Sequence, residues 1–341
     1  MATTETPLAP ARRIDPAFAA LVAISLLLAA VAPGAVGAVL ADTARSLAST
    51  LPFLAFAVLA MGWIKATGAD GAIARAFEGR ETVMILAAAL GGALSPFCSC
   101  EVIPLIATLL AAGVPLSAVM AFWLASPLMD PAMFALTAAA LGPELAIAKL
   151  TAAILIAIVA GFATKALSGT GLLADPMRPG AAPRSCCGAG PSLMTRRPVW
   201  RFWSEPDRRA TFTDAARSNA IFLFKWLALA YLIEALMVRY LPAEAISTVL
   251  GGEGVGPVFL AALIGAPAYL NGYAAPALVS GLVEAGMTPG AALSFLIAGG
   301  VTCIPAAVAV WALVQRRVFG LYLMFGAGGA VAAGLTLNLL V

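Results

Sequence analysis

Long apolar segments separated by short polar stretches run through almost the whole chain. None of them shows the strict alternation of a half-buried strand, and most approach or exceed the roughly 20 residues that a helix needs to cross a bilayer. The pattern predicts an all-α integral membrane protein. The nine segments cover approximately residues 14–40, 47–64, 83–112, 116–141, 145–167, 220–238, 255–283, 291–314 and 318–341.

Composition supports this prediction and limits the partners. Hydrophobic residues make up 62% of the chain and charged residues only 11%, whereas a soluble domain has about 25% charged residues. The net charge is +3, and the arginines cluster in loops. We therefore expect the lipid bilayer and a small solute as partners, and no nucleic acid. Arg12 and Arg13 precede an apolar run too long for a signal peptide, so we interpret it as the first transmembrane helix.

A polar insert at residues 168–218, rich in Gly, Pro and Arg, divides the chain into two halves. We predict an N-terminal tail and first transmembrane helix at 1–46, a first membrane repeat at 47–167, the insert, and a second membrane repeat at 219–341.

The two halves resemble each other in sequence. Residues 112–116 (AGVPL) lead into 122–125 (FWLA), and residues 285–289 (AGMTP) lead into 295–298 (FLIA). Pro104 and Pro276 stand upstream at comparable places. An internal duplication of this kind is typical of transporters.

The positions of the arginines constrain the orientation of the repeats. If all nine segments crossed the membrane from a cytoplasmic N-terminus, the arginine-rich insert would lie outside, against the positive-inside rule. The insert becomes cytoplasmic if segment 83–112 does not cross the membrane but forms two half-helices, each rising ~18 Å, that turn back near residues 97–101. Segment 255–283 would form a second hairpin that turns back at 266–272. We predict about seven spanning helices and two re-entrant or broken-helix hairpins, arranged as two inverted repeats, with the N-terminus and the insert cytoplasmic.

The first predicted hairpin break carries unusual chemistry. Cys98 and Cys100, with Ser99 between them, can project to the same side of an extended backbone. The chain has five cysteines and no histidine, so a metal site would rest on thiolates and would favour soft ions or trivalent metalloids. We predict Cys98 and Cys100 as ligands and Cys303 as a third thiol. The alternative is that these cysteines are small apolar packing residues.

Two carboxylates stand next to proline breaks within apolar segments. Glu101 follows Cys100, and Asp130 lies between Pro127 and Pro131. We predict that they carry a coupling proton or bind a cation, since ionisable residues at membrane depth are usually functional. The alternative is that each lies at a segment end or caps a broken helix.

The second half offers different groups at the matching break. Asn271 and Tyr273 occupy the position of the cysteine pair, and they would either hydrogen-bond a substrate or stabilise the partner hairpin. Prolines mark the expected helix breaks of both halves. These are Pro96, Pro104, Pro127, Pro131, Pro267, Pro276 and Pro305.

The insert contains the remaining two thiols. Cys186 and Cys187 are adjacent, a spacing that strains a disulfide, so we expect reduced thiols facing the cytoplasm. They would capture a metal(loid) and pass it to the pore, or they are incidental residues of a disordered insert.

Three of these motifs resemble the signature of a known family. Residues 96–105 (PFCSCEVIPL), 113–115 (GVP) and 125–131 (ASPLMDP) are similar to those of predicted bacterial permeases, a family that includes the trivalent organoarsenical efflux permeases (ArsP). The resemblance implies export of a thiol-reactive metal(loid) across the inner membrane, with the signature cysteines as ligands. The family pattern has Gly at the position of Glu101 and Asn at that of Asp130. Both departures add negative charge, so the cargo could be a cation rather than a neutral arsenical.

We therefore predict an inner-membrane permease that exports a thiol-reactive metal(loid) species, either a trivalent organoarsenical or a soft metal ion. No phosphate-binding loop for nucleotides is present, so a proton gradient is the expected drive, and we expect neither a cofactor nor an enzymatic activity. One alternative is a membrane thiol-disulfide oxidoreductase that uses Cys98 and Cys100 against Cys186 and Cys187. Another is a permease for a non-thiophilic small solute with structural cysteines. The sequence leaves the oligomeric state open.

Overall fold

A computed structural model describes residues 16–68, 79–95, 102–111, 113–178, 199–240, 254–266, 275–284, 286–302 and 304–340. Within these residues the regular structure is helical, and the only extended pairing is an isolated bridge between Met177 and Val314. The predicted all-α class is confirmed for this part of the chain. The helices are α1 Pro16–Val31, α2 Pro33–Thr67, α4 Glu81–Leu94, α5 Val102–Ala111, α6 Leu116–Ala125, α7 Pro131–Leu141, α8 Pro143–Ser168, η2 Phe202–Ser204, α9 Pro206–Tyr240, α11 Val255–Gly265, α12 Ala275–Glu284, α13 Pro289–Val301, α14 Ile304–Leu313 and α15 Arg316–Leu340.

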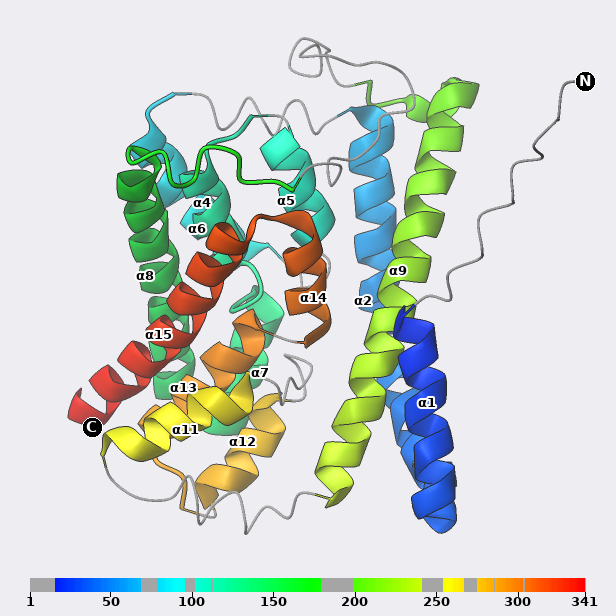
Figure 1. The fold of residues 1–341 in the computed structure, drawn as a ribbon, viewed down its shortest axis with the longest axis vertical. Coiled ribbons are helices and arrows are strands. Elements are labelled where there is room, and N and C mark those ends of the chain that lie inside the picture. The colour runs from blue at the N-terminus through cyan, green and yellow to red at the C-terminus, as the bar shows by residue number, and fades with distance from the viewer. Residues whose placement is uncertain are drawn as a thin grey trace, which may run out of the picture.

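Helices α1, α2 and α9 stand together at one side of the molecule (Figure 1). The expected single helix over residues 14–40 is divided, because α1 ends at Val31 and α2 begins at Pro33, a residue suited to the first helical position. Helix α2 then continues through the polar stretch at 41–46, where Thr43 Oγ1 donates to Val39 O at 2.7 Å. No Gly or Pro interrupts residues 38–51. The domain boundary predicted at residue 46 therefore lies within a helix.

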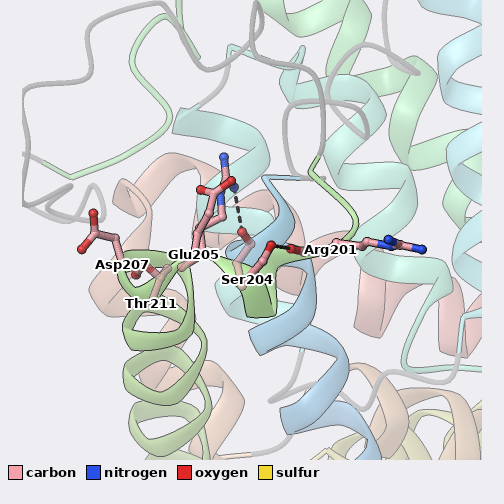
Figure 2. Close-up of polar contacts among 7 residues, drawn as sticks. Arg201, Ser204, Glu205, Asp207 and Thr211 are labelled. Carbon is pink, nitrogen blue, oxygen red and sulfur yellow. Dashed lines mark hydrogen bonds and ion pairs between the residues drawn. The ribbon is translucent and has the colours of Figure 1, made fainter.

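Helix α9 begins within the predicted insert, at Pro206. Its start is held by local hydrogen bonds, from Ser204 Oγ to Arg201 O at 2.7 Å and from Arg208 Nε to Glu205 Oε2 at 2.7 Å (Figure 2). Arg208 also donates from Nη1 to Ala66 O at 2.8 Å. This contact joins the start of α9 to the end of α2, along which α9 packs.

The remaining helices form two sets, α4–α8 and α11–α15, that lie head to tail (Figure 1). Helices α4 and α5 occupy the end of the molecule near the start of α9, whereas α11 and α12 occupy the opposite end. The second helix of each pair packs against the other set: α5 contacts α14, and α12 contacts α7. The long helices α8 and α15 contact each other between the sets.

Some features of the two sets recur at one fixed sequence separation. We call the sequence separation of Gly113 and Gly286 the repeat offset. Both glycines have positive φ, of 84° and 104°, and each ends its helix in the same way. The N–H of Gly113 bonds to Leu110 O and that of Val114 bonds to Leu109 O; at the repeat offset, Gly286 bonds to Val283 O and Met287 to Leu282 O. Both turns are Schellman motifs. Helices α5 and α12, each of 10 residues, begin and end at this same offset.

The closest helix contacts also recur at the repeat offset. Gly161 in α8 and Gly334 in α15 are separated by the repeat offset. Gly161 lets α8 approach α4 and α6, and Gly334 lets α15 approach α11 and α13. A Cβ on Gly161 would lie 2.6 Å from Ile85 Cγ2, and a Cβ on Gly334 would lie 2.7 Å from Val258 Cγ1. Their further neighbours match as well, with Ala121 and Ser117 around Gly161, and Ser294 and Gly290 around Gly334. The sequence match between the halves thus extends to the neighbours of these two glycines.

Two helices of the described residues, α8 and α15, are each long and apolar enough to cross a membrane on their own. Helices α13 and α14 meet at 47° and add a third span if they are counted as one. The shorter apolar helices, among them α4, α6, α7 and α11, have 10–17 residues. Trp200 and Trp203 are each 57% exposed, as expected of side chains at a membrane interface.

Candidate functional site

Described residues beside three of the helix interruptions contact one another. The end of α4 contacts the break between α6 and α7, where the hydroxyls of Ser95 and Ser126 lie 3.0 Å apart. The end of α13 packs on the same break, because a Cβ on Gly300 would lie 3.3 Å from Pro127 O. The described flanks of the first hairpin and of the two broken helices are therefore neighbours.

The prolines predicted to break helices stand mostly at helix starts. Pro131 is the first residue of α7, and Pro276 and Pro305 are the second residues of α12 and α14. Pro104 lies in the first turn of α5, and Pro127 lies in the turn after α6. Proline is tolerated at these places because the first N–H groups of a helix have no partner within it. Pro96 and Pro267 lie outside the described residues.

Most of the predicted ligands also fall outside the described residues. This holds for Cys98, Cys100, Glu101, Asn271, Tyr273, Cys303, Cys186 and Cys187. Among the residues that the structure does describe, no group of three or more Cys, Asp or Glu side chains could hold a metal ion. The thiol site therefore remains a prediction from the sequence.

Asp130 is the predicted site residue whose side chain the structure places. It is 6% exposed and caps α7, with Oδ1 accepting from Met133 N at 2.8 Å. The capping role that the sequence offered as an alternative is thus present. A capping carboxylate keeps its negative charge, so capping alone does not decide between the two roles considered for Asp130.

Lys149 in α8 is a site residue that the sequence reasoning missed. It is 3% exposed, its Nζ donates to Met133 Sδ at 3.1 Å, and it interacts electrostatically with Asp130. We call Asp130, Met133 and Lys149 the Asp130–Lys149 cluster. The signal was visible, since a lysine within the apolar segment 145–167 should be as informative as a carboxylate there.

The second set has no charge at the equivalent place. Tyr322 stands at the repeat offset from Lys149, and its hydroxyl donates to Val301 O near the end of α13. Its ring stacks on Trp123 of α6, with the ring centroids 4.8 Å apart. Trp123 is fully buried, and its Nε1–H finds no hydrogen-bond partner among the described residues. A phenol stacked on an indole thus stands at the repeat offset from Lys149.

A cavity of about 780 Å³ lies between α8 and α15, and it is almost entirely apolar. Its lining includes Leu155, Ile156 and Val159 from α8 and Met324 and Phe325 from α15. It contains none of the predicted site residues. Its few polar lining residues are Glu144, Thr151 and Thr336, and no cysteine lines it, so the cavity suits a hydrocarbon rather than a thiophilic ion.

Both flanks of the insert are anchored to the helices. At its start, Arg178 N donates to Leu313 O at 3.0 Å, and Gln315 N donates to Pro176 O at 2.9 Å. The Arg178 guanidinium stacks 4.5 Å from the centre of the Trp311 ring. At its end, Val199 N donates to Thr67 O at 3.0 Å. Residues 179–198 between these anchors, with both insert cysteines, lie outside the described part.

Comparison with known proteins identifies the family. The predicted permease family ArsP_1 matches residues 36–339, which include both sets of helices. The chain belongs to this family of predicted permeases. The permease is also 35% identical over 96 residues to the UPF0718 protein YcgR of Bacillus subtilis (strain 168). That match covers 28% of this chain and 33% of the relative. No solved structure matches the permease.

The resemblance seen in the sequence is thus confirmed at the level of the family. Membership of this family and the apolar helices support a multi-pass membrane permease, and the family suggests a transporter. Its substrate, its coupling ion and the membrane in which it resides are matters for proposal.

Proposed function

We propose that this permease exports a thiol-reactive metal(loid) species across the bacterial inner membrane in exchange for protons. The observation that carries the proposal is the meeting of the first-half break at Ser126–Pro127 with the second-half break at Gly300, directly beside the end of α4 at Ser95. Transporters of inverted-repeat design place their substrate where interrupted helices of the two repeats meet near the midplane.

The arrangement of the helices supports an inverted repeat. We infer seven crossings by adding α1, α2, α9 and a broken span of α6 with α7 to α8, α15 and the bent pair α13–α14, which are apolar and long enough to span. The pairs α4–α5 and α11–α12 then serve as two hairpins entering from opposite ends (Figure 1). This agrees with the orientation that keeps the arginine-rich insert in the cytoplasm.

The cargo class follows from the sequence at the meeting point. In the sequence, Cys98 and Cys100 follow Ser95 by three and five positions, and Cys303 falls between the residues of α13 and those of α14. Thiolates are the donors that soft metal ions and trivalent metalloids prefer. We assign the cargo contact to these three cysteines, with Asn271 and Tyr273 on the second hairpin. The coupling proton falls to Glu101 or Asp130.

A thiol-disulfide oxidoreductase is supported less well. Its two cysteine pairs would need to meet, yet the start of the insert is tied to the α14–α15 turn and its end to α2. An electron shuttle also has no evident use for two matched sets of helices. A permease for a non-thiophilic solute would keep the fold but would not need Cys98 or Cys100.

A resistance screen tests the proposal. Cells that lack their own metal(loid) exporters would express the permease and be challenged with methylarsenite, arsenite, antimonite, copper and zinc. We expect protection against one or a few thiophilic species, lost in the Cys98→Ser/Cys100→Ser variant and retained in a Cys186→Ser/Cys187→Ser control. Protection that survives loss of Cys98 and Cys100 would indicate a permease with structural cysteines, and protection against none of the five would contradict the proposed cargo class.

A further inference from the structure

We propose that the start of the insert and the turn between α14 and α15 form a binding site for the phosphate group of an anionic phospholipid. Arg178 and Arg316 provide its positive charge, and Trp311 provides the adjoining apolar surface. The site is separate from the helix breaks and concerns the lipid partner of the permease. The inference therefore goes beyond the proposed function and does not depend on the cargo.

Hydrogen bonds to the backbone hold Arg178 against the α14–α15 turn. Its N–H donates to Leu313 O at 3.0 Å, and its Nε donates to Val314 O at 2.9 Å. Gln315 N donates in the other direction, to Pro176 O at 2.9 Å. The guanidinium is thus fixed in place without a ligand, and a group held in this way loses less conformational freedom when a ligand binds.

Two guanidinium groups lie over the same indole ring. The guanidinium carbon of Arg178 is 4.5 Å from the centre of the Trp311 ring, and that of Arg316 is 5.6 Å from it. Each contact is a favourable cation–π interaction. The two charges are, however, no further apart than about one Debye length, ~10 Å at 0.1 M salt, so they repel each other. An anion bound to both arginines would offset this repulsion.

In the part of the chain that the structure describes, no carboxylate balances these arginines. None of the ion pairs found there includes Arg178 or Arg316. The sequence has no Asp or Glu between Asp175 and Glu205, and none after Glu284. Asp175 itself is exposed and belongs to none of the ion pairs. The positive charge of the site is therefore available to an anion from outside the chain.

The site also offers hydrogen-bond donors. Nη2 of Arg178 is buried and has no acceptor among the described residues, which is unfavourable for a charged group. Arg316 is exposed and begins α15, where the first N–H groups have no partner within the helix and the helix dipole is positive. Arg317 donates instead to Leu172 O at 3.5 Å. A phosphate group fits the remaining donors, because guanidinium groups bind its oxygens through paired N–H···O bonds.

The surroundings favour a lipid headgroup over a soluble phosphate. Trp311 is 39% exposed, and Val308 in the same helix is 47% exposed. Trp311 also packs edge to face against Phe319 of α15, with the ring centroids 5.2 Å apart. Apolar surface thus continues directly from the guanidinium groups, as suits a molecule whose phosphate carries acyl chains. We expect this end of the permease to be cytoplasmic, where anionic lipids bind to basic pockets between membrane helices.

Native mass spectrometry of the full-length permease in detergent tests the site. The purified protein would be titrated with phosphatidylglycerol, which is anionic, or with phosphatidylcholine, which has no net charge, and the Kd of the first bound lipid would be measured. Arg178→Gln/Arg316→Gln removes both guanidinium groups of the site. The matched control is Arg201→Gln/Arg209→Gln, which removes two exposed arginines beside the start of α9, at the same end of the molecule.

We expect the wild type to bind phosphatidylglycerol about tenfold more tightly than phosphatidylcholine. Arg178→Gln/Arg316→Gln should weaken phosphatidylglycerol binding by about tenfold and leave phosphatidylcholine binding unchanged, because each arginine beside an anionic headgroup contributes to the affinity. The control should keep the wild-type affinity. Unchanged binding by the site variant, an equal loss in the control, or equal binding of both lipids by the wild type would overturn the inference.

Inorganic phosphate distinguishes the two sources of the phosphate group. Added at millimolar concentration, it should leave phosphatidylglycerol binding unchanged, and displacement of the lipid would assign the site to a soluble phosphate and overturn the lipid assignment. If the double variant does not fold, Arg316→Gln alone provides the test, since Arg316 is exposed and its loss leaves the core intact. This variant should show a smaller loss of affinity in the same direction, and wild-type affinity would contradict the site.

Discussion

At the residue scale, Asp130 shows how much of a residue's role can be predicted from the sequence alone. Its position between Pro127 and Pro131 in an apolar segment was enough to mark it as a special residue and to suggest a capping role, which the structure bears out. Its partnership with Lys149 required the fold. The sequence does not show that α7 and α8 fold back on each other at Gly142, whose φ of 91° allows the sharp turn.

The glycines at helix crossings give a prediction at this scale. A Cβ on Gly265 in α11 would lie 2.6 Å from Phe295 O in α13, a contact with backbone that no rotamer change relieves. Gly265→Ala should therefore destabilise the permease by about 1–3 kcal/mol. Fluorescence-detected size-exclusion chromatography after heating measures this as a lower unfolding midpoint.

Gly256→Ala is the matched control in the same helix, because nothing lies within 4 Å of a Cβ at Gly256. Its midpoint should equal or exceed that of the wild type. Equal behaviour of the two variants would show that α11 and α13 are not in close contact.

At the element scale, two matching helix-ending turns were predictable and some helix boundaries were not. The matching runs at residues 112–116 and 285–289 correctly indicated equivalent turns, because each contains the glycine that ends a helix with positive φ. The start of α9 at Pro206 was missed because residues 206–218 are polar. Pattern analysis assigns such residues to a loop, whereas here they extend a helix that packs along α2 beyond its apolar part.

The two matched turns should respond alike to substitution. Gly113→Ala and Gly286→Ala place a side chain at positive φ, which costs about 1–2 kcal/mol each. Thermal unfolding midpoints should fall to a similar extent in both variants. Gly281→Ala, at an open position within α12, should instead raise the midpoint slightly, since alanine is favoured in helices by about 1 kcal/mol. A loss at only one of the two turns would argue against their equivalence.

At the scale of the whole molecule, the arginine distribution and the duplication together predict hairpins entering from opposite ends. Helices α4 and α5 lie at one end of the molecule and α11 and α12 at the other, which supports this prediction (Figure 1). The sequence could not reveal which elements of the two sets pair. The contacts of α5 with α14 and of α12 with α7 are long-range and leave no periodic signal in either segment. The anchoring of the insert through Arg178 and Trp311 was likewise out of reach of the sequence.

The orientation of the whole molecule gives a prediction about the insert. Its flanks lie at the end of the molecule that carries the starts of α9 and α15, with Arg208, Arg209, Arg316 and Arg317. We expect this end to be cytoplasmic. A membrane-impermeant maleimide should therefore label Cys186 and Cys187 in everted vesicles but not in intact spheroplasts. A Cys186→Ser/Cys187→Ser variant serves as the background control, and efficient labelling in spheroplasts would reverse the orientation.

The central claim is that thiols at the meeting point of the two repeats carry a metal(loid) outwards against a proton gradient. Its most direct test is methylarsenite uptake into everted vesicles energised by an imposed pH difference, for the wild type and for Cys98→Ser/Cys100→Ser. We predict accumulation by the wild type, collapse of that accumulation on addition of a protonophore, and no accumulation by the variant. Equal accumulation by both proteins, or accumulation that persists without any gradient, would contradict the account.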